Sequence, residues 1–407
     1  MNKYTIQLFN LPEGLWIDTI EKIDEKIIIK CRSTKKYAIC PHCKMKTKKM
    51  NQYRIRYLKH GNINNTNTVI QLSLRQFICK NHLQQKTFME KIQGIDRRRT
   101  TSNFRRLTME WLQRNSFRYI GNKFSVSGNS LARMVRENHK EWKTDWALLA
   151  EKKIKLGIDE HSFRGRDLSL TLTEVKQRKL LSILPNDRLV TLEAWLENMP
   201  EFAKKQIDEV CMDLKVGYKN TVEKILPHAQ ITADRFHVEQ LANRVVDEMR
   251  SVVVSCEPRR MYIKEILLKG KEKLTGEERI KLNMVFKKYE KFPCLYEAWF
   301  VKEKLRDMYR ARNKSKAQKI FEEIISLLED SHYSRYFETF KKTLKLWNKN
   351  ILNYFNHYTT NAYTEGAHTK IKLMKRVSYG FRNIHNYIAK MMLAFLPLCW
   401  ILNHHTI

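Results

Sequence analysis

The sequence predicts a multidomain α/β protein, in which a mixed sheet core with a helical insertion follows two smaller N-terminal modules. Three observations support this fold class. Short apolar runs with a period of two alternate with helical patterns between residues 154 and 233, as they do in α/β domains. The stretch from 238 to 350 has an almost wholly helical pattern. A chain of 407 residues also suits several domains better than one.

The charge of the chain points to a polyanionic partner. The sequence has 77 Lys and Arg residues against 43 Asp and Glu residues, a formal net charge of +34. No acidic residue occurs between Lys26 and Met89, and none follows Glu365. Such a surplus favours nucleic acid, because neutralised phosphates release counterions. No membrane partner is expected, since the N-terminus lacks a signal-type apolar core and the apolar run 391–402 is too short to cross a bilayer.

Two ligand pairs lie within the first module, a β-rich segment expected to span residues 1–95. Cys40 and Cys43 form the first pair and Cys79 and His82 the second, each with two residues between the ligands. The short spacing lets one turn direct both ligands at one ion, and two such pairs close a tetrahedral shell. We therefore predict a structural Zn²⁺ ion that also helps this short module to fold. Unrelated buried cysteines are the alternative interpretation.

Other residues of this module suggest alternative zinc ligands, and its apolar runs predict strands. His82 is the least secure ligand, and Cys31 and His42 are its possible substitutes. Eight cysteines in a chain of this length do not form a disulfide scaffold, and a C-x-x-C pair indicates metal binding in a reducing compartment. Apolar alternations at 6–9 and 27–29 predict strands.

Residues 96–150 predict a helix-turn-helix domain. Thr101 or Ser102 can cap a first helix, a second helix fits 117–124, and a third runs from Asn129 to about His139 after a break at 125–128. In such a domain the last helix enters the DNA major groove, although any small helical bundle would show the same pattern. The polar residues that lie away from its apolar stripe and could contact DNA are Asn129, Ser130, Arg133 and Arg136.

The core carries acids at the ends of its predicted strands. We expect strands at 154–158, 168–172, 180–184, 209–213 and 229–233, with helices at 189–199 and 217–226. Asp159, Asp213 and Asp234 end the first, fourth and fifth strands. Ligands of open α/β sheets gather at the carboxyl ends of parallel strands, so these acids should lie together. Taken alone, Asp159 could be a solvated strand end.

One further acid stands at the start of the last basic helix. Glu365 is followed by His368, Lys372 and Arg376 on the same helix face. A carboxylate among positive side chains suits a cation beside DNA phosphates, although it could simply stabilise the helix N-terminus. Asp159, Asp213 and Glu365 together could hold two Mg²⁺ or Mn²⁺ ions next to a phosphodiester.

Four segments make the sequence similar to a known family. They are GIDE at 157–160 followed by HSFRGR, the strand ending in Met212 and Asp213, ADRFH at 233–237, and TEGAHTKIKLMKR at 364–376. These segments, and the order of the modules, resemble DDE transposases of bacterial insertion sequences, in particular the ISL-three family. The resemblance covers nearly the whole chain.

The resemblance implies a ribonuclease H-like core and assigns roles to its acids. The first part of this core would span residues 151–256. A helical insertion would span 257–352, and the C-terminal helices of the core would span 353–407. Asp159, Asp213 and Glu365 would be the catalytic triad. Asp234 and His237 match a D-x-x-H element with a supporting role, or else form a surface pair. Two positions depart from the family pattern: His82 replaces a Cys and His368 replaces an Asn.

The family also implies an activity. The protein would bind the terminal inverted repeats of its element and the target DNA, and would cleave and transfer strands as a homodimer or larger homo-oligomer in the bacterial cytoplasm, on the nucleoid. The alternatives are a non-catalytic DNA-binding regulator derived from a transposase, and a nuclease or resolvase that does not join strands.

Overall fold

The computed structural model describes residues 9–63, 66–82, 84–95, 99–255, 263–331 and 334–397. The chain forms two compact units. The first consists of residues 1–143 and 371–407, and the second of residues 144–370. Among the described residues, no helix combines the length and the apolar character that a membrane crossing requires.

A five-stranded sheet forms the N-terminal part of the first unit. Its order is β1-β2-β6-β5, with β7 paired to the end of β6. The strands are β1 (Leu15–Ile23), β2 (Lys26–Ser33), β5 (Met50–Ile63), β6 (Thr66–Cys79) and β7 (Lys86–Met89). On β6, Ile70, Leu72 and Leu74 are buried with a period of two, so only one face of the sheet packs on a core.

The expectation for this module is met in part. The alternation at 27–29 lies in β2 as expected. The alternation at 6–9 falls mostly on residues 1–8, outside the described residues. Strand β1 and the long β5–β6 hairpin were not predicted, because their basic and polar residues obscure the alternation. A small hairpin of β3 (Ala38–Ile39) and β4 (Lys46–Thr47) carries the first ligand pair.

Three helices follow at the expected positions: α2 (Ser102–Leu112), α3 (Phe117–Phe124) and α4 (Gly128–His139). Each begins at a hydroxyl N-cap, where the side chain of Thr101, Ser116 or Ser127 accepts a hydrogen bond from an amide three residues later. Ser125 ends α3 with a φ of +52°, which makes the tight turn into α4. This is the predicted helix-turn-helix arrangement.

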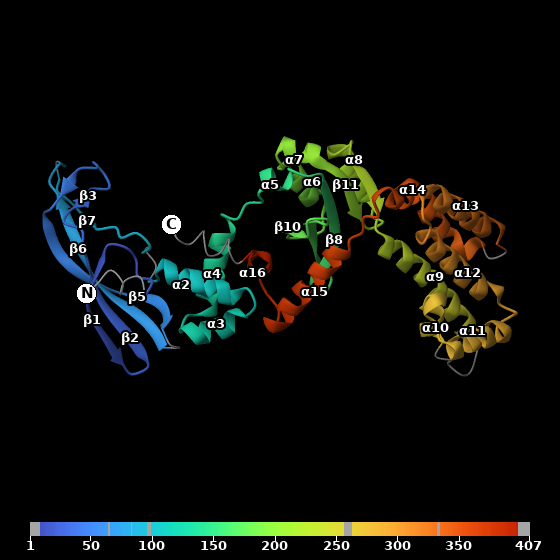
Figure 1. Cartoon of the computed structure of the whole chain (residues 1–407), viewed down its shortest axis with the longest axis horizontal. Coiled ribbons are helices and arrows are strands. Elements are labelled where there is room, and N and C mark those ends of the chain that lie inside the picture. Colours follow the sequence, from blue (N-terminus) through green and yellow to red (C-terminus); the bar gives the residue numbers. More distant parts are fainter. Residues whose placement is uncertain are drawn as a thin grey trace. The chain divides into compact units, whose positions relative to one another are not determined.

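A helix from the far end of the chain completes this helical core. Helix α16 (Ile384–Phe395) packs against α4 and α2 (Figure 1), and its Ala389 and Leu393 are buried with Phe104 and Leu112. The buried Lys390 ammonium donates to the backbone oxygen of Leu112, the last residue of α2. Residues from Ile371 onward group with the first unit, whereas the sequence analysis placed 353–407 with the α/β core.

The second unit contains the mixed sheet of a ribonuclease H-like core. Its order is β10-β9-β8-β11-β12, in which β8, β9 and β10 are antiparallel and β8, β11 and β12 are parallel. The strands are β8 (Ile154–Arg164), β9 (Asp167–Glu174), β10 (Lys179–Leu184), β11 (Ile207–Met212) and β12 (Gln230–Ala233). The accompanying helices are α5 (Trp146–Leu149), α6 (Leu189–Glu197), α7 (Glu201–Gln206) and α8 (Val216–Ile225). All five expected strands are present.

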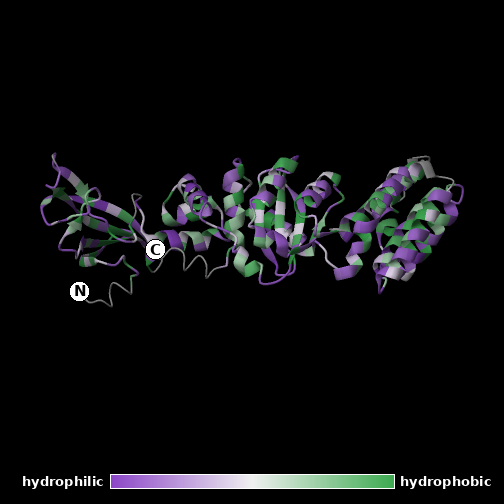
Figure 2. Cartoon of the chain, turned by 90° about the horizontal axis from the view of Figure 1, so that it is seen from above, coloured by the Kyte–Doolittle hydropathy of each residue, from purple (hydrophilic) through white to green (hydrophobic). Residues whose placement is uncertain are grey.

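A helical region follows β12 and packs largely on itself. It comprises α9 (Arg235–Ser255), α10 (Lys264–Leu268), α11 (Gly276–Lys288), α12 (Pro293–Tyr309), α13 (Lys314–Asp330) and α14 (Ser334–His357). Hydrophilic and hydrophobic residues are interspersed in this helical region (Figure 2), as in amphipathic helices that share a core. The helical region starts with α9, earlier than the expected boundary at 257. Helix α15 (Ala362–Val377) then returns to the sheet.

Candidate active site and zinc site

Three neighbouring parallel strands place three aspartates at one edge of the sheet. Ile158 of β8 pairs with Met212 of β11, and Met212 pairs with Ala233 of β12. The residue after each of these is an aspartate, so Asp159, Asp213 and Asp234 follow one another across the sheet. The parallel register therefore aligns them, as the sequence predicted.

The prediction that Asp159 ends its strand was wrong. Strand β8 continues to Arg164 because β9 pairs with it along that length. Asp159 instead marks the point where β8 separates from β11, and its side chain is buried. A strand that continues on one side holds this carboxylate more rigidly than a free strand end would.

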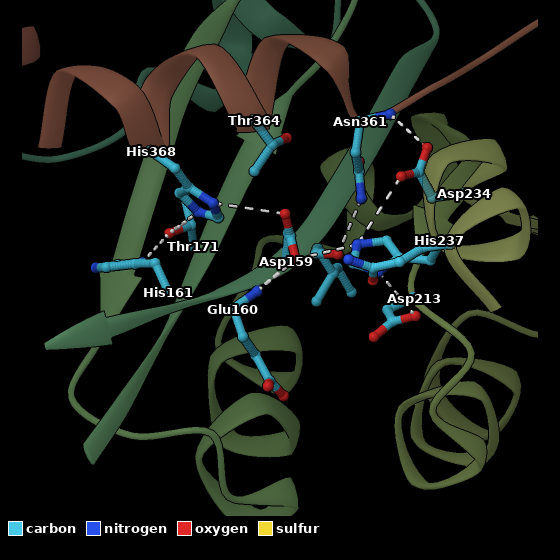
Figure 3. Close-up of polar contacts among 12 residues, drawn as sticks. Asp159, Glu160, His161, Thr171, Asp213, Asp234, His237, Asn361, Thr364 and His368 are labelled. Carbon is cyan, nitrogen blue, oxygen red and sulfur yellow. Dashed lines mark hydrogen bonds and ion pairs between the residues drawn. The ribbon is translucent and has the colours of Figure 1, made fainter. Parts of the chain in front are cut away.

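His237 lies among the three aspartates (Figure 3). It belongs to the first turn of α9. Its Nε2 atom is 3.7 Å from an Asp159 oxygen and 4.0 Å from an Asp234 oxygen, and its Nδ1 atom is 3.3 Å from an Asp213 oxygen. The imidazole thus contacts all three carboxylates, and the supporting pair Asp234 and His237 is part of the same cluster.

The carboxylates repel one another. Burial, with added repulsion from Asp234 and Asp213, raises the pKa of Asp159 to about 6 against the lowering effect of His237. Burial also raises the pKa of Asp234 to about 6, and Glu365 and Asp213 add to this shift. One buried oxygen of Asp234 has no hydrogen-bond partner. Crowded, partly unsatisfied carboxylates are a donor set that suits a hard divalent cation.

Helix α15 docks on the sheet next to this cluster through polar contacts. The backbone amide of Asn361 donates to Asp234 (3.1 Å), and its side-chain amide donates to the backbone oxygen of Ile158 (3.1 Å). The hydroxyls of Thr364 on α15 and Thr173 on β9 are 2.7 Å apart. These contacts fix the start of the helix that carries Glu365.

Glu365 is half-buried in the first turn of α15. Its charge acts on Asp234, as the raised pKa of that residue indicates. In the described part of the chain, no hydrogen bond or ion pair joins Glu365 to Asp159 or Asp213. The structure therefore brings Asp159, Asp213, Asp234 and His237 into direct contact and places Glu365 within electrostatic range of the cluster.

His368 has a different environment from the one expected. It was expected to contact DNA, but the residue is only 7% exposed. Its Nδ1 atom is 3.5 Å from Asp159, and its Nε2 atom is 2.9 Å from the hydroxyl of Thr171. Thr171 also contacts His161, 2.8 Å away, and the two histidine rings lie 4.9 Å apart. His368 therefore orients Asp159, while Lys372 and Arg376 of α15 are exposed as expected.

A second buried group anchors the segment before α15. Glu209 on β11 is fully buried and accepts hydrogen bonds of 2.6 Å from Thr232 and from Thr359. The ammonium of Lys155 pairs with it at 2.9 Å. This group ties the α14–α15 connection to the centre of the sheet. The sequence analysis did not identify Glu209, and it also missed His161, Thr171 and Asn361. Two of these had a signal: His161 follows GIDE directly, and Thr171 pairs with Asp159 in the β8–β9 register.

The predicted zinc ligands converge at a separate site in the first unit. The ligand atoms of Cys40, Cys43, Cys79 and His82 all lie within 4.8 Å of one another. The Cys40 sulfur is 3.4 Å from His82 Nε2, and the Cys43 and Cys79 sulfurs are 3.5 Å apart. Zinc–sulfur bonds of about 2.3 Å place tetrahedral sulfurs about 3.8 Å apart, so the four residues fit a structural zinc ion.

The neighbouring residues support this ligand set. Although burial acts in the opposite direction, hydrogen bonds from the Cys43 and His42 backbone and from His82 lower the pKa of Cys40 to about 6, which favours the thiolate that zinc requires. Cys31, a possible substitute, lies in the hydrophobic core of the sheet, and burial raises its pKa to about 12. The ring of His42 meets that of His82 edge-on, 5.9 Å away.

Comparison with known proteins decides the family. The model of the ISL3 (ISL-three) family of DDE transposases, described as "Transposase", matches residues 156–391, which is more than half of the chain. This chain belongs to the ISL3 transposase family. A second model, described as "zinc-finger of transposase IS204/IS1001/IS1096/IS1165", matches residues 36–82, which contain all four zinc ligands.

Two curated relatives agree with this assignment. The chain is 21% identical over 400 residues to the transposase for insertion sequence element IS1001 of Bordetella parapertussis, covering 94% of this chain and 96% of the relative. It is 25% identical over 295 residues to the transposase for insertion sequence element IS1557 of Mycobacterium tuberculosis, covering 62% and 65% of the two chains. The ISL3 match also spans every acid of the cluster.

The helix-turn-helix residues of this ISL3 transposase differ in accessibility. Asn129 and Arg133 on α4 are exposed. Ser130 is half-buried, and its hydroxyl lies 2.8 Å from that of the N-cap Ser127. Arg136 is half-buried as well. Asn129 and Arg133 are therefore the side chains of the expected set that α4 presents most openly.

Proposed function

We propose that this chain is a transposase that binds the terminal inverted repeats of its insertion sequence and cleaves and transfers the DNA strands with Asp159, Asp213 and Glu365. The observation that carries the proposal is the alignment of Asp159 and Asp213 by paired parallel strands, beside a helix that brings in Glu365. This alignment, together with the family to which the chain belongs, supports a site for metal-dependent phosphodiester chemistry.

The residues of the cluster would have different roles. Asp159, Asp213 and Glu365 would hold two Mg²⁺ or Mn²⁺ ions, which would activate a water molecule or a DNA 3′-hydroxyl as the nucleophile and stabilise the leaving oxygen. Asp234 fixes the start of α15 through the amide of Asn361. His368 holds one oxygen of Asp159 from the side opposite His237, which limits the rotation of this carboxylate.

The first unit would supply DNA binding. Its zinc ribbon stabilises the end of the long β5–β6 hairpin, and α4 presents Asn129 and Arg133 for groove or phosphate contacts. Exposed Lys372 and Arg376 on α15 would contact DNA phosphates. Since an element has two ends, at least two subunits would act together on DNA.

The proposal is tested by replacing Asp159, Asp213 and Glu365 singly by Ala. The DNA is a plasmid carrying the two ends that flank the coding sequence. Each variant should bind the ends like the unaltered protein but lose Mg²⁺-dependent strand cleavage and joining. Asp167→Ala is the matched control, because Asp167 is an exposed acid at the end of the β8–β9 hairpin and should leave cleavage unchanged.

Cleavage that persists in any of the three variants would rule out the triad. An unaltered protein that binds the ends but never cleaves them would instead be a non-catalytic regulator. Cleavage without joining to a target plasmid would identify a nuclease or resolvase.

A further inference from the structure

The N-terminal sheet leaves one of its faces open. Tyr53, Ile55 and Tyr57 of the edge strand β5 are 60%, 58% and 54% exposed. They alternate along the strand and so project from the same face. Their partners on β6 are Arg75, Ser73 and Gln71. None of these three partners is a large apolar residue that would cover the rings.

The opposite face of the same strands is the one that packs. Leu72 and Leu74 of β6 are buried, and they pair with Arg56 and Arg54 of β5. Directly paired residues share a face of the sheet. Tyr53, Ile55 and Tyr57 therefore belong to the outer face, away from the hydrophobic core. Among the described residues, neither tyrosine ring packs against another aromatic ring.

The outer face continues across the sheet. Ser73 pairs with Arg32 on β2, and Arg32 pairs with Trp16 on β1, which is 41% exposed. Arg32 is neutralised by Asp18, 3.0 Å away, so the β1 side carries little net charge. The basic residues without an ion-pair partner among the described residues lie at the β5 edge of the sheet, where the chain enters β5.

The positive charge of this part of the chain indicates the chemistry of its partner. Lys48 and Lys49 lie just before β5, are exposed, and take part in no ion pair within the described residues, whereas Arg54 projects from the opposite face and Arg75 is paired with Glu90 at 2.7 Å. The whole stretch between Lys26 and Met89 has no acidic residue. A second copy of the chain would bring the same positive strand, whereas DNA complements it.

The spacing of the side chains distinguishes between paired and unpaired DNA. Residues on one face of a strand repeat about every 6.8 Å, since each residue advances the strand by about 3.4 Å. Stacked bases in a duplex strand follow one another at about 3.4 Å. A continuous base stack cannot match successive side chains of this face, but an extended single strand can place its bases on rings at the wider spacing.

We propose that the outer face of this sheet, centred on Tyr53, Ile55 and Tyr57, binds an unpaired DNA strand by stacking its bases. The inference rests on the proposed function, because strand cleavage at the ends of an element produces DNA with unpaired segments. Aromatic rings on an open, positively charged sheet are the chemistry by which proteins bind single strands without reading their sequence.

The test uses the full-length, zinc-loaded chain and two DNA probes. One is a single-stranded oligothymidine, which cannot form a duplex, and the other is a blunt duplex of the element end. Tyr53→Ala and Tyr57→Ala should each weaken binding of the single strand by about 5-fold to 100-fold, the cost of losing one base–aromatic contact. Binding of the duplex should change by less than about twofold, as α4 is unaltered.

Tyr53→Phe and Tyr57→Phe are the matched controls, because they keep the ring and remove only the hydroxyl. Both should bind the single strand like the unaltered protein. A probe containing 5-iodouracil adds a measurement on the unaltered chain, and its photo-crosslinks should map to β5. Zinc content and thermal unfolding establish that each Ala variant is folded.

Three outcomes would overturn the inference. An equal loss on both probes would mean that the face contacts duplex DNA. Unchanged binding of the single strand, with crosslinks outside β5, would mean that the face has no role in it. A change of oligomeric state with unchanged single-strand binding would identify a subunit interface. Failure of the unaltered protein to bind the element-end duplex would instead count against the proposed function, which the single-strand probe does not test.

Discussion

The carboxyl group of Asp234 lies in surroundings that oppose its charge. Its pKa is raised from 3.8 to about 6 by burial and by the carboxylates near it. The folded chain therefore holds a proton on Asp234 more tightly than the unfolded chain does. It follows that the contribution of this group to the free energy of unfolding falls as the pH rises from about 4 to about 6, and stays low above that.

Asp234→Asn should therefore stabilise the second unit when no divalent ion is bound. In Mg²⁺-free buffer at pH 8 the free energy of unfolding should rise by about 1–3 kcal/mol, and the gain should disappear near pH 4. Urea unfolding followed by tryptophan fluorescence measures it, without a chelator that would also remove zinc. A gain of the same size at both pH values would mean that charge is not the cause.

Gly157 on β8 allows the close approach of α15. A Cβ atom at this position would lie 2.6 Å from Thr173 Oγ1, 2.7 Å from Val175 Cγ1 and 2.8 Å from Asn361 Oδ1. Gly157→Ala should displace Asn361, destabilise the second unit by about 1–3 kcal/mol, and reduce strand cleavage. Urea unfolding and the plasmid cleavage assay measure the two effects.

Gly276→Ala is the control for this substitution, because a Cβ atom there meets nothing within 4 Å. It lies at the start of α11, where Ala is tolerated, and should leave cleavage unchanged. Normal cleavage by Gly157→Ala would show that the start of α15 does not need this close contact.

At the residue scale, the acids were predictable and their partners were not. Asp213 and Asp234 each follow a short apolar run, so local alternation was enough to place them at a strand end. His237 was found through a motif three residues from Asp234. Thr171 and Asn361 are polar residues in unremarkable positions. Their roles depend on the return of α15 to the sheet, about two hundred residues after β8, which no local pattern reveals.

At the scale of elements, short helices with hydroxyl caps were predicted well, because the start signal and the apolar stripe lie within one local window. The bounds of α3 and the end of α4 agree with expectation. The partner of helix α16 was not predicted, because the resemblance placed residues 353–407 with the core of the second unit. Its apolar stripe fits any core, and only the structure shows that it packs with α2 and α4.

Leu393→Ala should therefore impair DNA binding although it lies far from α4 in the sequence. Leu393 is fully buried in the core shared by α2, α4 and α16. Its truncation should destabilise the first unit by about 2–5 kcal/mol, and it should weaken binding of the element-end duplex. Thermal unfolding and fluorescence anisotropy measure these effects.

Leu373→Ala is the matched control for Leu393→Ala. Leu373 is 58% exposed on α15, so its truncation leaves no cavity. It should leave both the stability of the first unit and duplex binding unchanged. Equal effects of the two substitutions would mean that packing of α16 is not what DNA binding requires.

At the scale of the whole molecule, the zinc ligands and the carboxylate cluster belong to different units of the chain. Cys79→Ser should remove the bound zinc and increase hydrogen exchange in β3, β4 and the adjoining ends of β5 and β6. Hydrogen exchange of β8, β11 and β12 should stay the same. Zinc content by elemental analysis and exchange by mass spectrometry measure both.

Cys31→Ser separates ligation from the loss of a buried thiol. Cys31 is as buried as Cys79 but lies in the hydrophobic core instead of the ligand cluster. This variant should keep one zinc ion per chain. Loss of zinc from it would mean that the ribbon depends on the packing of the sheet as much as on its four ligands.

The packing of α16 also sets an order of events during synthesis. A ribosome completes α2, α3 and α4 long before it reaches α16, so the helical core that contains Ala389 and Leu393 must wait for a segment that is made after the whole second unit. A product that terminates early, even one that already contains Glu365, would lack the final piece of this core. Only messenger RNAs translated through α16 would then yield chains able to bind the ends of the element.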